Sequence, residues 1–444
     1  MRILIVSCAC PPFHGGGVAN LIDQIGGRLG ALGHAVAVFT RYTDPRRKRG
    51  ILTWFRRQGY AVPAVNLART DFFDRYRVED YLNPVTHEPF RRVVEQFRPD
   101  VLHFHAIQGL GAGLIDWVPR DVPTVLTMHD FWWVCPNIFL LRLDDCLCPL
   151  KQADLAACAK CLQRLATLSP AHALNLDDIR HRHQYLCRQL RKFHKILAVS
   201  RFLRDRLKGF LPDTAIEVCE NGRDFGLLEA SGLAPRSDRG TRVRRNGPLR
   251  FGFVSGFSSL KGFGCLVTAL SYLHEPSFEV RVHGCRAARL RRLAARLPGA
   301  AYALRTILQR PLPPGAGPMD PRIRLLPPYL PNEWPRVHAS FDVLLVPSIV
   351  VESFSLVCRE ALAVGVPVIA SRCGGPEEVI QHEVNGLLFE PNNARELAEC
   401  MSRCLEEADL LASLRAHAKI DGIRTIEQQV EQLVGEYRAS GAPL

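Results

Sequence analysis

The chain has no apolar run long enough to cross a membrane as a helix, although 47% of its 444 residues are hydrophobic. Its N-terminus also lacks the features of a secretion signal, because the short apolar run 3–10 meets two prolines instead of a small-residue cleavage site. The 15 cysteines are odd in number and spread over a long chain, which favours a reducing compartment. We therefore expect a cytoplasmic protein.

Acidic residues are in the minority, with 44 Asp and Glu against 57 Lys and Arg, and the formal net charge is +13. Basic runs stand at 46–49, 201–208 and 239–245, and each could equally be a solvated face. The balance favours an anionic partner, such as a nucleotide, a phospholipid headgroup or a nucleic acid. A zinc-stapled nucleic-acid binder is disfavoured, because the basic runs lack interleaved aromatics and the cysteines lack an ordered C-x2-C…H-x3-H spacing. We expect no nucleic-acid partner.

Short apolar, β-branched runs alternate with longer mixed segments in the first half of the chain. They are RILIVS, AVAVFT, VLHFH, TVLTMH and KILAVS. Strands that are buried on both faces and joined by helices have this pattern, which predicts a parallel, doubly wound sheet. The pattern lapses between 222 and 248, in a segment rich in Pro, Gly and Arg, and then resumes with RFGFVSG, FEVRVHG, RIRLLP, FDVLLVPS, VPVIAS and GLLFE.

The sequence therefore predicts an α/β fold with two Rossmann-like, doubly wound parallel-sheet domains that face each other across a cleft. We see no sequence repeat between the halves. The expected bounds are 1–222 for the N-terminal domain, with a cysteine-rich insertion at about 135–161, 223–248 for a linker and 249–420 for the C-terminal domain. The segment 421–444 has helical apolar spacing and could pack back across the domain junction.

Two carboxylates, Glu352 and Glu360, lie in the mostly apolar stretch 351–370. On one regular helix, eight positions would separate them by roughly 80°, so they would not point the same way. Both can reach one ligand if Glu352 lies in the loop after a strand and a helix begins at 353–355. The free amides of such a helix start suit a diphosphate. The acids would then accept hydrogen bonds from sugar and ribose hydroxyls, and Lys261 would supply the cation. The plainer alternative is a capping acid and a solvated helix acid.

The stretch PSIVVESFSLVCREALAVGVPVIASRCGGPEEVI, with NGLLFEP downstream, closely resembles the C-terminal signature of the retaining glycosyltransferases of family 4, which have the GT-B architecture. Further matches follow in family order: PPFHGGGVAN, DVLHFH, TMHDFWWVCP, AVSRFLRD, ENGRD and FGFVSGFSSLKG. The resemblance implies transfer of a sugar from a nucleotide-diphosphate sugar to a hydroxyl acceptor, with retention, in polysaccharide, glycolipid or glycoconjugate biosynthesis. It makes the N-terminal domain the acceptor side and the C-terminal domain the nucleotide-sugar side.

The resemblance also assigns roles to individual residues. Gly16 and Gly17 would meet the donor diphosphate and the acceptor, although their loop lacks GxGxxG spacing and could be an ordinary tight turn. His129 would contact the transferred sugar and support charge at the anomeric carbon, and Asp130 could orient it or cap the next element. Glu352 would contact the sugar hydroxyls and Glu360 the ribose diol. The phosphates would be held by the backbone amides of Ser353, Phe354, Ser355 and Leu356.

Lys261 would stabilise the departing diphosphate, which removes the need for a divalent metal, and we expect no catalytic metal. No residue is an obvious covalent nucleophile, so the mechanism we favour is front-face transfer. Many relatives place an arginine a few residues before the lysine, whereas 256–260 holds no basic residue. Either Arg201 substitutes or donor binding is weaker. The alternative function is a non-catalytic nucleotide-sugar-binding or scaffold protein of the same fold.

A cysteine cluster and an aromatic basic run complete the candidates. Four thiolates at this spacing can bind zinc or an iron–sulfur cluster, and some relatives share the segment, but free buried cysteines are the alternative. The expected ligands are Cys135, one of Cys146 or Cys148, Cys158 and Cys161. The run 54–57, Trp-Phe-Arg-Arg, suggests a lipid-linked glycan acceptor and peripheral contact with an anionic membrane at its inner face, or only a solvated loop.

Overall fold

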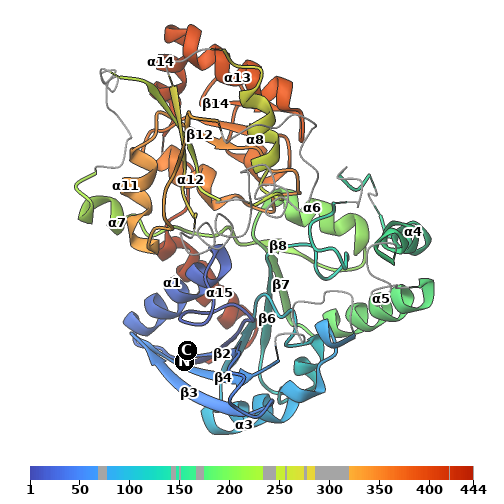
Figure 1. Ribbon diagram of the computed structural model, residues 1–444. Coiled ribbons are helices and arrows are strands. Elements are labelled where there is room, and N and C mark those ends of the chain that lie inside the picture. The colour runs from blue at the N-terminus through green and yellow to red at the C-terminus, as the bar shows by residue number, and fades with distance from the viewer. Residues whose placement is uncertain are drawn as a thin grey trace. The chain divides into compact units, whose positions relative to one another are not determined.

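The computed structural model describes residues 1–68, 78–141, 147–149, 152–166, 175–233, 247–255, 258–274, 278–285, 320–419 and 421–443. The chain divides into two compact units (Figure 1). The first unit is Met1–Asp224 with Arg424–Leu444, and the second unit is Phe225–Ile423. Each unit has its own parallel sheet, which confirms the predicted fold class.

Among the described residues, the sheet of the first unit has eight strands in the order β3-β4-β2-β1-β5-β6-β7-β8. Their bounds are β1 (Arg2–Val6), β2 (Ala35–Tyr42), β3 (Leu52–Arg57), β4 (Tyr60–Asn66), β5 (Val101–Phe104), β6 (Thr124–Met128), β7 (Lys195–Ala198) and β8 (Glu217–Val218). All neighbours pair in parallel except the hairpin of β3 and β4. The strand order reverses between β1 and β5, so the carboxyl ends of these two strands flank the topological switch point.

The central strands of this sheet are buried on both faces, which explains why their sequences are continuous apolar runs. Every residue from Ile3 to Val6 is fully buried. The helices around the sheet are α1 (Gly17–Ala31), α3 (His87–Phe97), α4 (Leu155–Ala166), α5 (Leu176–Leu190), α6 (Arg201–Phe210) and α15 (Ile426–Ala439).

Helix α15 comes from the end of the chain but belongs to the first unit, where it packs against α1 (Figure 1). Val430, Leu433 and Tyr437 enter the same core cluster as Ile22 and Ile25. The backbones also approach closely at the start of α15. A Cβ on Gly222 would lie 2.2 Å from the carbonyl oxygen of Thr425, so only glycine fits there.

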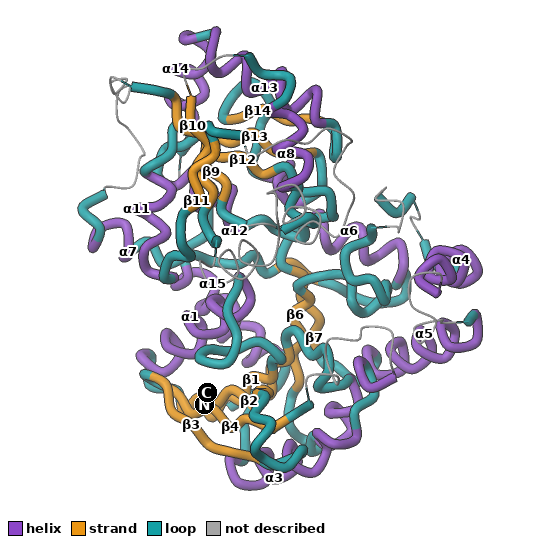
Figure 2. Tube along the Cα trace, in the orientation of Figure 1, coloured by secondary structure: helices purple, strands orange, loops and turns teal. Residues whose placement is uncertain are grey.

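Among the described residues, the sheet of the second unit has six strands, all parallel, in the order β11-β10-β9-β12-β13-β14. Figure 2 shows these strands in orange. The bounds are β9 (Leu249–Phe253), β10 (Phe278–Val282), β11 (Ile323–Leu325), β12 (Val343–Val346), β13 (Val368–Ser371) and β14 (Gly386–Phe389). The order is that of a doubly wound sheet, with its switch point between β9 and β12.

Buried hydrophobic side chains pack on both faces of this second sheet. Along β12, Val343 and Leu345 point into one cluster, whereas Leu344 and Val346 point into another. The helices are α7 (Gly226–Ala230), α8 (Phe263–Leu270), α11 (Trp334–Ala339), α12 (Leu356–Ala363), α13 (Ala394–Glu406) and α14 (Ala408–His417). Helix α7 lies in the segment 223–248, for which we expected a linker, and 234–246 falls outside the described residues.

Within the described ranges, no helix is both long and apolar enough to traverse a bilayer.

Candidate functional site

The candidate residues follow the strands at the two switch points, where parallel sheets of this order bind ligands. In the first unit, the glycine loop follows β1, His105 follows β5 and His129 follows β6. In the second unit, Lys261 follows β9 and Glu352 follows β12. Residues distant in the sequence therefore meet at one edge of each sheet.

The glycine loop leads directly into α1, whose first residue is Gly17. Gly16 has a φ of +107°, which L side chains rarely adopt. A Cβ on Gly15 or Gly16 would meet no atom within 4 Å, so the space above this backbone is open among the described residues. The loop thus offers helix-terminal amides to an approaching group, as an anion site requires.

His129 is buried and lies against a second histidine. Its Nε2 is 2.8 Å from Nδ1 of His105, and the two rings are stacked. Burial lowers the pKa of His129 to about 4, so its imidazole is neutral at pH 7. Asp130 accepts hydrogen bonds from the Trp132 amide (2.9 Å) and from the Gln108 side chain (3.0 Å), so it helps to fix the turn that follows β6.

A third histidine continues this buried chain. Nδ1 of His103 is 2.7 Å from the hydroxyl of Tyr437 on α15, and its Nε2 is 2.7 Å from Oγ1 of Thr127. Burial lowers the pKa of His103 to about 3 and that of His105 well below its ordinary value. Three buried, neutral imidazoles therefore lie together at the carboxyl ends of β5 and β6.

These depressed pKa values predict that the first unit loses stability in mild acid. In the unfolded chain, histidines titrate near pH 6.5, so between pH 6.5 and about 4 the unfolded state binds more protons. The free energy of unfolding should therefore fall as pH falls through this window, by about 1.4 kcal/mol per pH unit for each histidine. Urea titrations at pH 7 and 5.5 measure this, and His103→Asn should flatten the dependence. Equal stability of the wild type at both pH values would contradict the prediction.

The second unit brings Lys261 and Glu352 into direct contact. Nζ of Lys261 donates to Oε1 of Glu352 at 2.6 Å, and Oγ of Ser348 donates to the same oxygen at 2.5 Å. The Lys261 side chain is 40% exposed and that of Glu352 is 12% exposed. Burial lowers the pKa of Lys261, but the Glu352 carboxylate outweighs it and the net shift is upward. The ammonium is therefore charged and partly open to solvent.

The loops that carry this pair are fixed by backbone contacts. A Cβ on Gly262 would lie 1.6 Å from the Pro347 carbonyl oxygen, so glycine is required beside Lys261. The amide of Ile349 donates to the carbonyl of Leu260 at 3.1 Å. On its other side, Glu352 pairs with the turn after β13, where the Gly375 amide donates to the Glu352 carbonyl at 2.7 Å. The pair is thus held in place before any ligand binds.

The turn of 353–356 leads into α12, as the sequence predicted, and Leu356 is the first helical residue. A buried arginine supports the turn. The guanidinium of Arg359, 2% exposed, lies 3.5 Å from the Phe354 ring centroid and donates to the Phe354 carbonyl. It also lies 3.5 Å from Oε2 of Glu378, in the turn after β13. Arg359 therefore ties the two turns of this edge together.

Ser355 caps α12 in a left-handed conformation, with a φ of +58°. This region costs a non-glycine residue about 1–2 kcal/mol. We expect Ser355→Gly to raise the free energy of unfolding by up to about 1 kcal/mol, part of the relief being offset by the greater freedom of glycine in the unfolded chain. Urea unfolding measures the change, and a destabilised variant would show that the Oγ contact with Cys358 outweighs the strain.

Glu360 contacts a histidine, and Arg201 belongs to the other unit. The Glu360 side chain is 5% exposed, and its Oε2 is 3.6 Å from Nε2 of the fully buried His338. Arg201 is exposed at the start of α6 in the first unit. Residues 256 and 257, where relatives lead us to expect a basic residue, lie outside the described residues. The roles given to Glu360 and Arg201 stay predictions.

Four of the five clustered cysteines are described, whereas Cys146 lies outside the described residues. Burial raises the pKa of Cys158 to about 12, and the neighbouring thiols of Cys135, Cys148 and Cys161 add to the rise. The four side chains are thus neighbours. However, no three potential ligands among the described residues are placed to hold a metal ion. Zinc or iron–sulfur binding stays a prediction.

Sequence reasoning missed the partners of the site residues. Ser348 and Arg359 support the Glu352 loop, and His105 contacts His129. Ser348 stands directly after a strand at the switch point, which could have flagged it. An arginine within the mostly apolar helix 356–363, next to Glu360, was a second available signal, because a buried charge needs a partner.

Two family models match the chain in consecutive order. The model for Glycosyltransferase Family 4 matches residues 15–226, and the model for Glycosyl transferases group 1 matches residues 325–421. The D-inositol 3-phosphate glycosyltransferase of Corynebacterium urealyticum is 29% identical over 216 residues, which are 47% of this chain and 48% of that relative. The match thus spans about half the length of this curated relative.

Solved structures share the fold. Sucrose-phosphate synthase from Thermosynechococcus elongatus has a TM-score of 0.67 at 19% identity, over 98% of both chains. HepE of Anabaena in complex with UDP-glucose has a TM-score of 0.58 at 16% identity, over 98% of this chain and 99% of that one. At such identities the likeness establishes the fold, here GT-B. With both family models matched in order on this fold, the chain belongs to the family 4 glycosyltransferases.

Proposed function

We propose that the protein transfers a sugar from a nucleotide-diphosphate sugar to a hydroxyl acceptor, with retention of the anomeric configuration. The observation that carries the proposal is the Lys261–Glu352 pair at the switch point of the second sheet, beside the N-terminus of α12. Family membership supports it, as do fold relatives solved with UDP or UDP-glucose. The pathway we propose is polysaccharide, glycolipid or glycoconjugate synthesis in the cytoplasm.

In the free protein, Lys261 and Glu352 neutralise each other. A donor diphosphate carries more negative charge than one carboxylate, so it should draw the ammonium of Lys261 away from Glu352. The released carboxylate can then accept hydrogen bonds from the sugar hydroxyls, while Ser348 keeps it in position. Donor binding thus replaces the Lys261–Glu352 ion pair with two contacts to the donor, one from Lys261 to the diphosphate and one from Glu352 to the sugar.

The same cation would lower the barrier of the chemical step. Negative charge grows on the diphosphate as its bond to the anomeric carbon breaks, and Lys261 and the amides at the start of α12 would stabilise it. One preorganised contact of this kind is worth about 3 kcal/mol. These groups supply positive charge where a divalent metal would otherwise be needed. In the first unit, we propose that His129 contacts the sugar being transferred.

Hydrolysis and transfer assays with a panel of UDP-, GDP- and ADP-sugars separate an enzyme from a non-catalytic binder. We expect the wild type to turn over one donor and Glu352→Gln to do so about 100-fold more slowly, because the neutral amide accepts weaker hydrogen bonds. The matched control is Glu399→Gln, which removes an exposed carboxylate from α13 of the same unit. No turnover of any donor by the wild type would favour the binder, and equal turnover by the wild type and Glu352→Gln would contradict the role proposed for Glu352.

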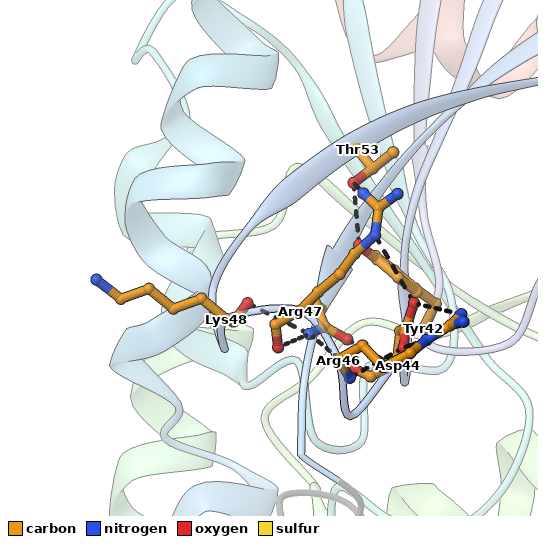
Figure 3. A network of polar contacts seen from close by, with 7 residues as sticks. Tyr42, Asp44, Arg46, Arg47, Lys48 and Thr53 are labelled. Carbon is orange, nitrogen blue, oxygen red and sulfur yellow. Dashed lines mark hydrogen bonds and ion pairs between the residues drawn. The ribbon is translucent and has the colours of Figure 1, made fainter.

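The loop between β2 and β3 offers a surface for a lipid-linked glycan acceptor. Asn66 fixes its backbone by donating to the carbonyls of Asp44, Arg47 and Lys48 at 2.9–3.2 Å. Arg46, whose side chain is 87% exposed, pairs with Asp44, while Lys48 extends away from the network (Figure 3). Nearby, the side chains of Ile51 and Trp54 are both 43% exposed. Exposed cations beside exposed apolar groups suit an anionic membrane surface, and we propose peripheral contact there.

Vesicle sedimentation tests this contact. We expect binding to vesicles that contain phosphatidylglycerol and less binding to pure phosphatidylcholine. The double variant Arg46→Gln with Lys48→Gln should bind the anionic vesicles about 10- to 30-fold more weakly, since each basic residue contributes about 1 kcal/mol near such a surface. Equal binding to both kinds of vesicle would contradict the proposal.

We also propose that the cysteine cluster binds structural zinc or an iron–sulfur cluster through Cys135, one of Cys146 or Cys148, Cys158 and Cys161. Elemental analysis of protein purified without chelators should find about one zinc, or iron with sulfide, per chain. Cys158→Ser with Cys161→Ser should abolish it, whereas Cys187→Ser, at a free thiol on α5, should not. Metal-free wild-type protein would overturn the proposal.

A further inference from the structure

The hydrogen bond between His105 and His129 contains one proton, which belongs to one of the two rings. Nδ1 of His105 and Nε2 of His129 are 2.8 Å apart, so one nitrogen donates and the other accepts. Both rings are neutral at pH 7, because burial depresses both pKa values. A neutral imidazole carries one N–H, so the direction of this hydrogen bond decides which nitrogen of each ring has the proton.

The surroundings distinguish the two directions. Nε2 of His105 is buried without a hydrogen-bond partner among the described residues. If His129 donated, His105 would carry its proton on this nitrogen, and a buried N–H would be orphaned. If His105 donates, the same nitrogen is a bare acceptor. Orphaned buried N–H groups are rarer in proteins than under-satisfied acceptors, which favours donation by His105.

If His105 donates, Nδ1 of His129 must carry the proton of that ring. His129 keeps 8% of its surface exposed, and its Nδ1 is not among the buried atoms that lack a partner. With Nε2 accepting from His105, the single proton of His129 must be on Nδ1. The imidazole then presents an N–H donor outward, suited to a hydroxyl or carbonyl-type oxygen of a ligand.

We propose that His105 is a positioning residue: its Nδ1–H donates to Nε2 of His129 and fixes the proton of His129 on Nδ1, facing the ligand. The inference rests on the proposed function in taking that ligand to be the sugar substrate. His103 lies on β5, two residues before His105, and its ring contacts Tyr437 and Thr127. These contacts fix the end of the strand that carries His105.

Two replacements of nearly equal shape test the direction of the hydrogen bond. His105→Asn keeps a donor near the position of Nδ1, whereas His105→Asp places an acceptor there and forces the His129 proton onto Nε2. We expect kcat to fall by less than about 5-fold in the Asn variant and by about 100-fold in the Asp variant, with KM little changed, because the outward donor is lost. His103→Asn is the matched buried control and should lower stability without moving the His129 proton.

Nitrogen-15 NMR of histidine-labelled protein reads the tautomer directly, with His129→Gln to assign the signal. This measurement needs no substrate, so it stands even if no donor is turned over. We expect the proton of His129 on Nδ1 in the wild type and on Nε2 in His105→Asp. A wild-type signal with the proton on Nε2, or equal kcat in the Asn and Asp variants, would overturn the proposal.

Discussion

Replacing Lys261 with methionine is expected to lower kcat by about 100- to 1,000-fold, the effect of removing one preorganised charge contact from a transition state. Methionine keeps most of the side-chain volume, so the loop beside Gly262 should remain in place. The Glu352 carboxylate loses its cation and would face the diphosphate without compensation, which adds repulsion to the lost attraction.

Steady-state kinetics with the best donor of the panel would measure this loss. Lys419→Met is the matched control, because it removes a lysine of the same unit from the segment after α14 and not from a loop that follows β9 or β12, and it should behave as the wild type. A Lys261→Met enzyme that keeps more than a tenth of wild-type kcat would show that other groups stabilise the leaving diphosphate.

The second large effect is on stability. Arg359→Met should lower the free energy of unfolding of the second unit by about 3–5 kcal/mol, the usual result of removing one partner from a buried ion pair. The guanidinium is 2% exposed and the Glu378 side chain 12% exposed, so water cannot replace the lost contacts. The Phe354 carbonyl would also lose its donor.

Urea unfolding of the variants separates charge from packing. Arg359→Met combined with Glu378→Gln should recover part of the loss, because no buried charge is left unpaired. Arg395→Met, at an exposed position of α13, should change stability by less than about 0.5 kcal/mol. A loss below 1 kcal/mol for Arg359→Met would mean that Glu378 is solvated or differently paired.

Most of the strands that sequence reasoning found are buried on both faces, although β11 is a half-exposed edge strand. Each apolar run named from the sequence is a strand of the two parallel sheets, because a run such as 3–6 has no other way to bury every residue. The strands that were not predicted from the sequence are β3, β4 and β8. Strand β3 is an edge strand with Trp54 and Arg56 exposed, β4 contains Pro63, and β8 has only two residues.

The candidate site was predictable to the extent that topology fixes it. Lys261 and Glu352 are 91 positions apart, yet their strands are neighbours in any doubly wound sheet of this order, so their loops must meet. The contact of His103 with Tyr437, across 334 positions, was not predictable, because it depends on where α15 packs. The His105–His129 and Arg359–Glu378 contacts depend on side-chain rotamers, which no pattern of residues reveals.

Calorimetric titration with UDP, GDP and ADP tests the role of the Lys261–Glu352 pair most directly. The tightest of these ligands should bind Lys261→Met about 10- to 100-fold more weakly than the wild type, the loss of one charge-assisted contact. It should bind Glu352→Gln at least as tightly as the wild type, because Lys261 is already released, although sugar turnover by that variant falls. Equal affinity of the wild type and Lys261→Met for all three nucleotides would contradict the assignment of this pair as the diphosphate site.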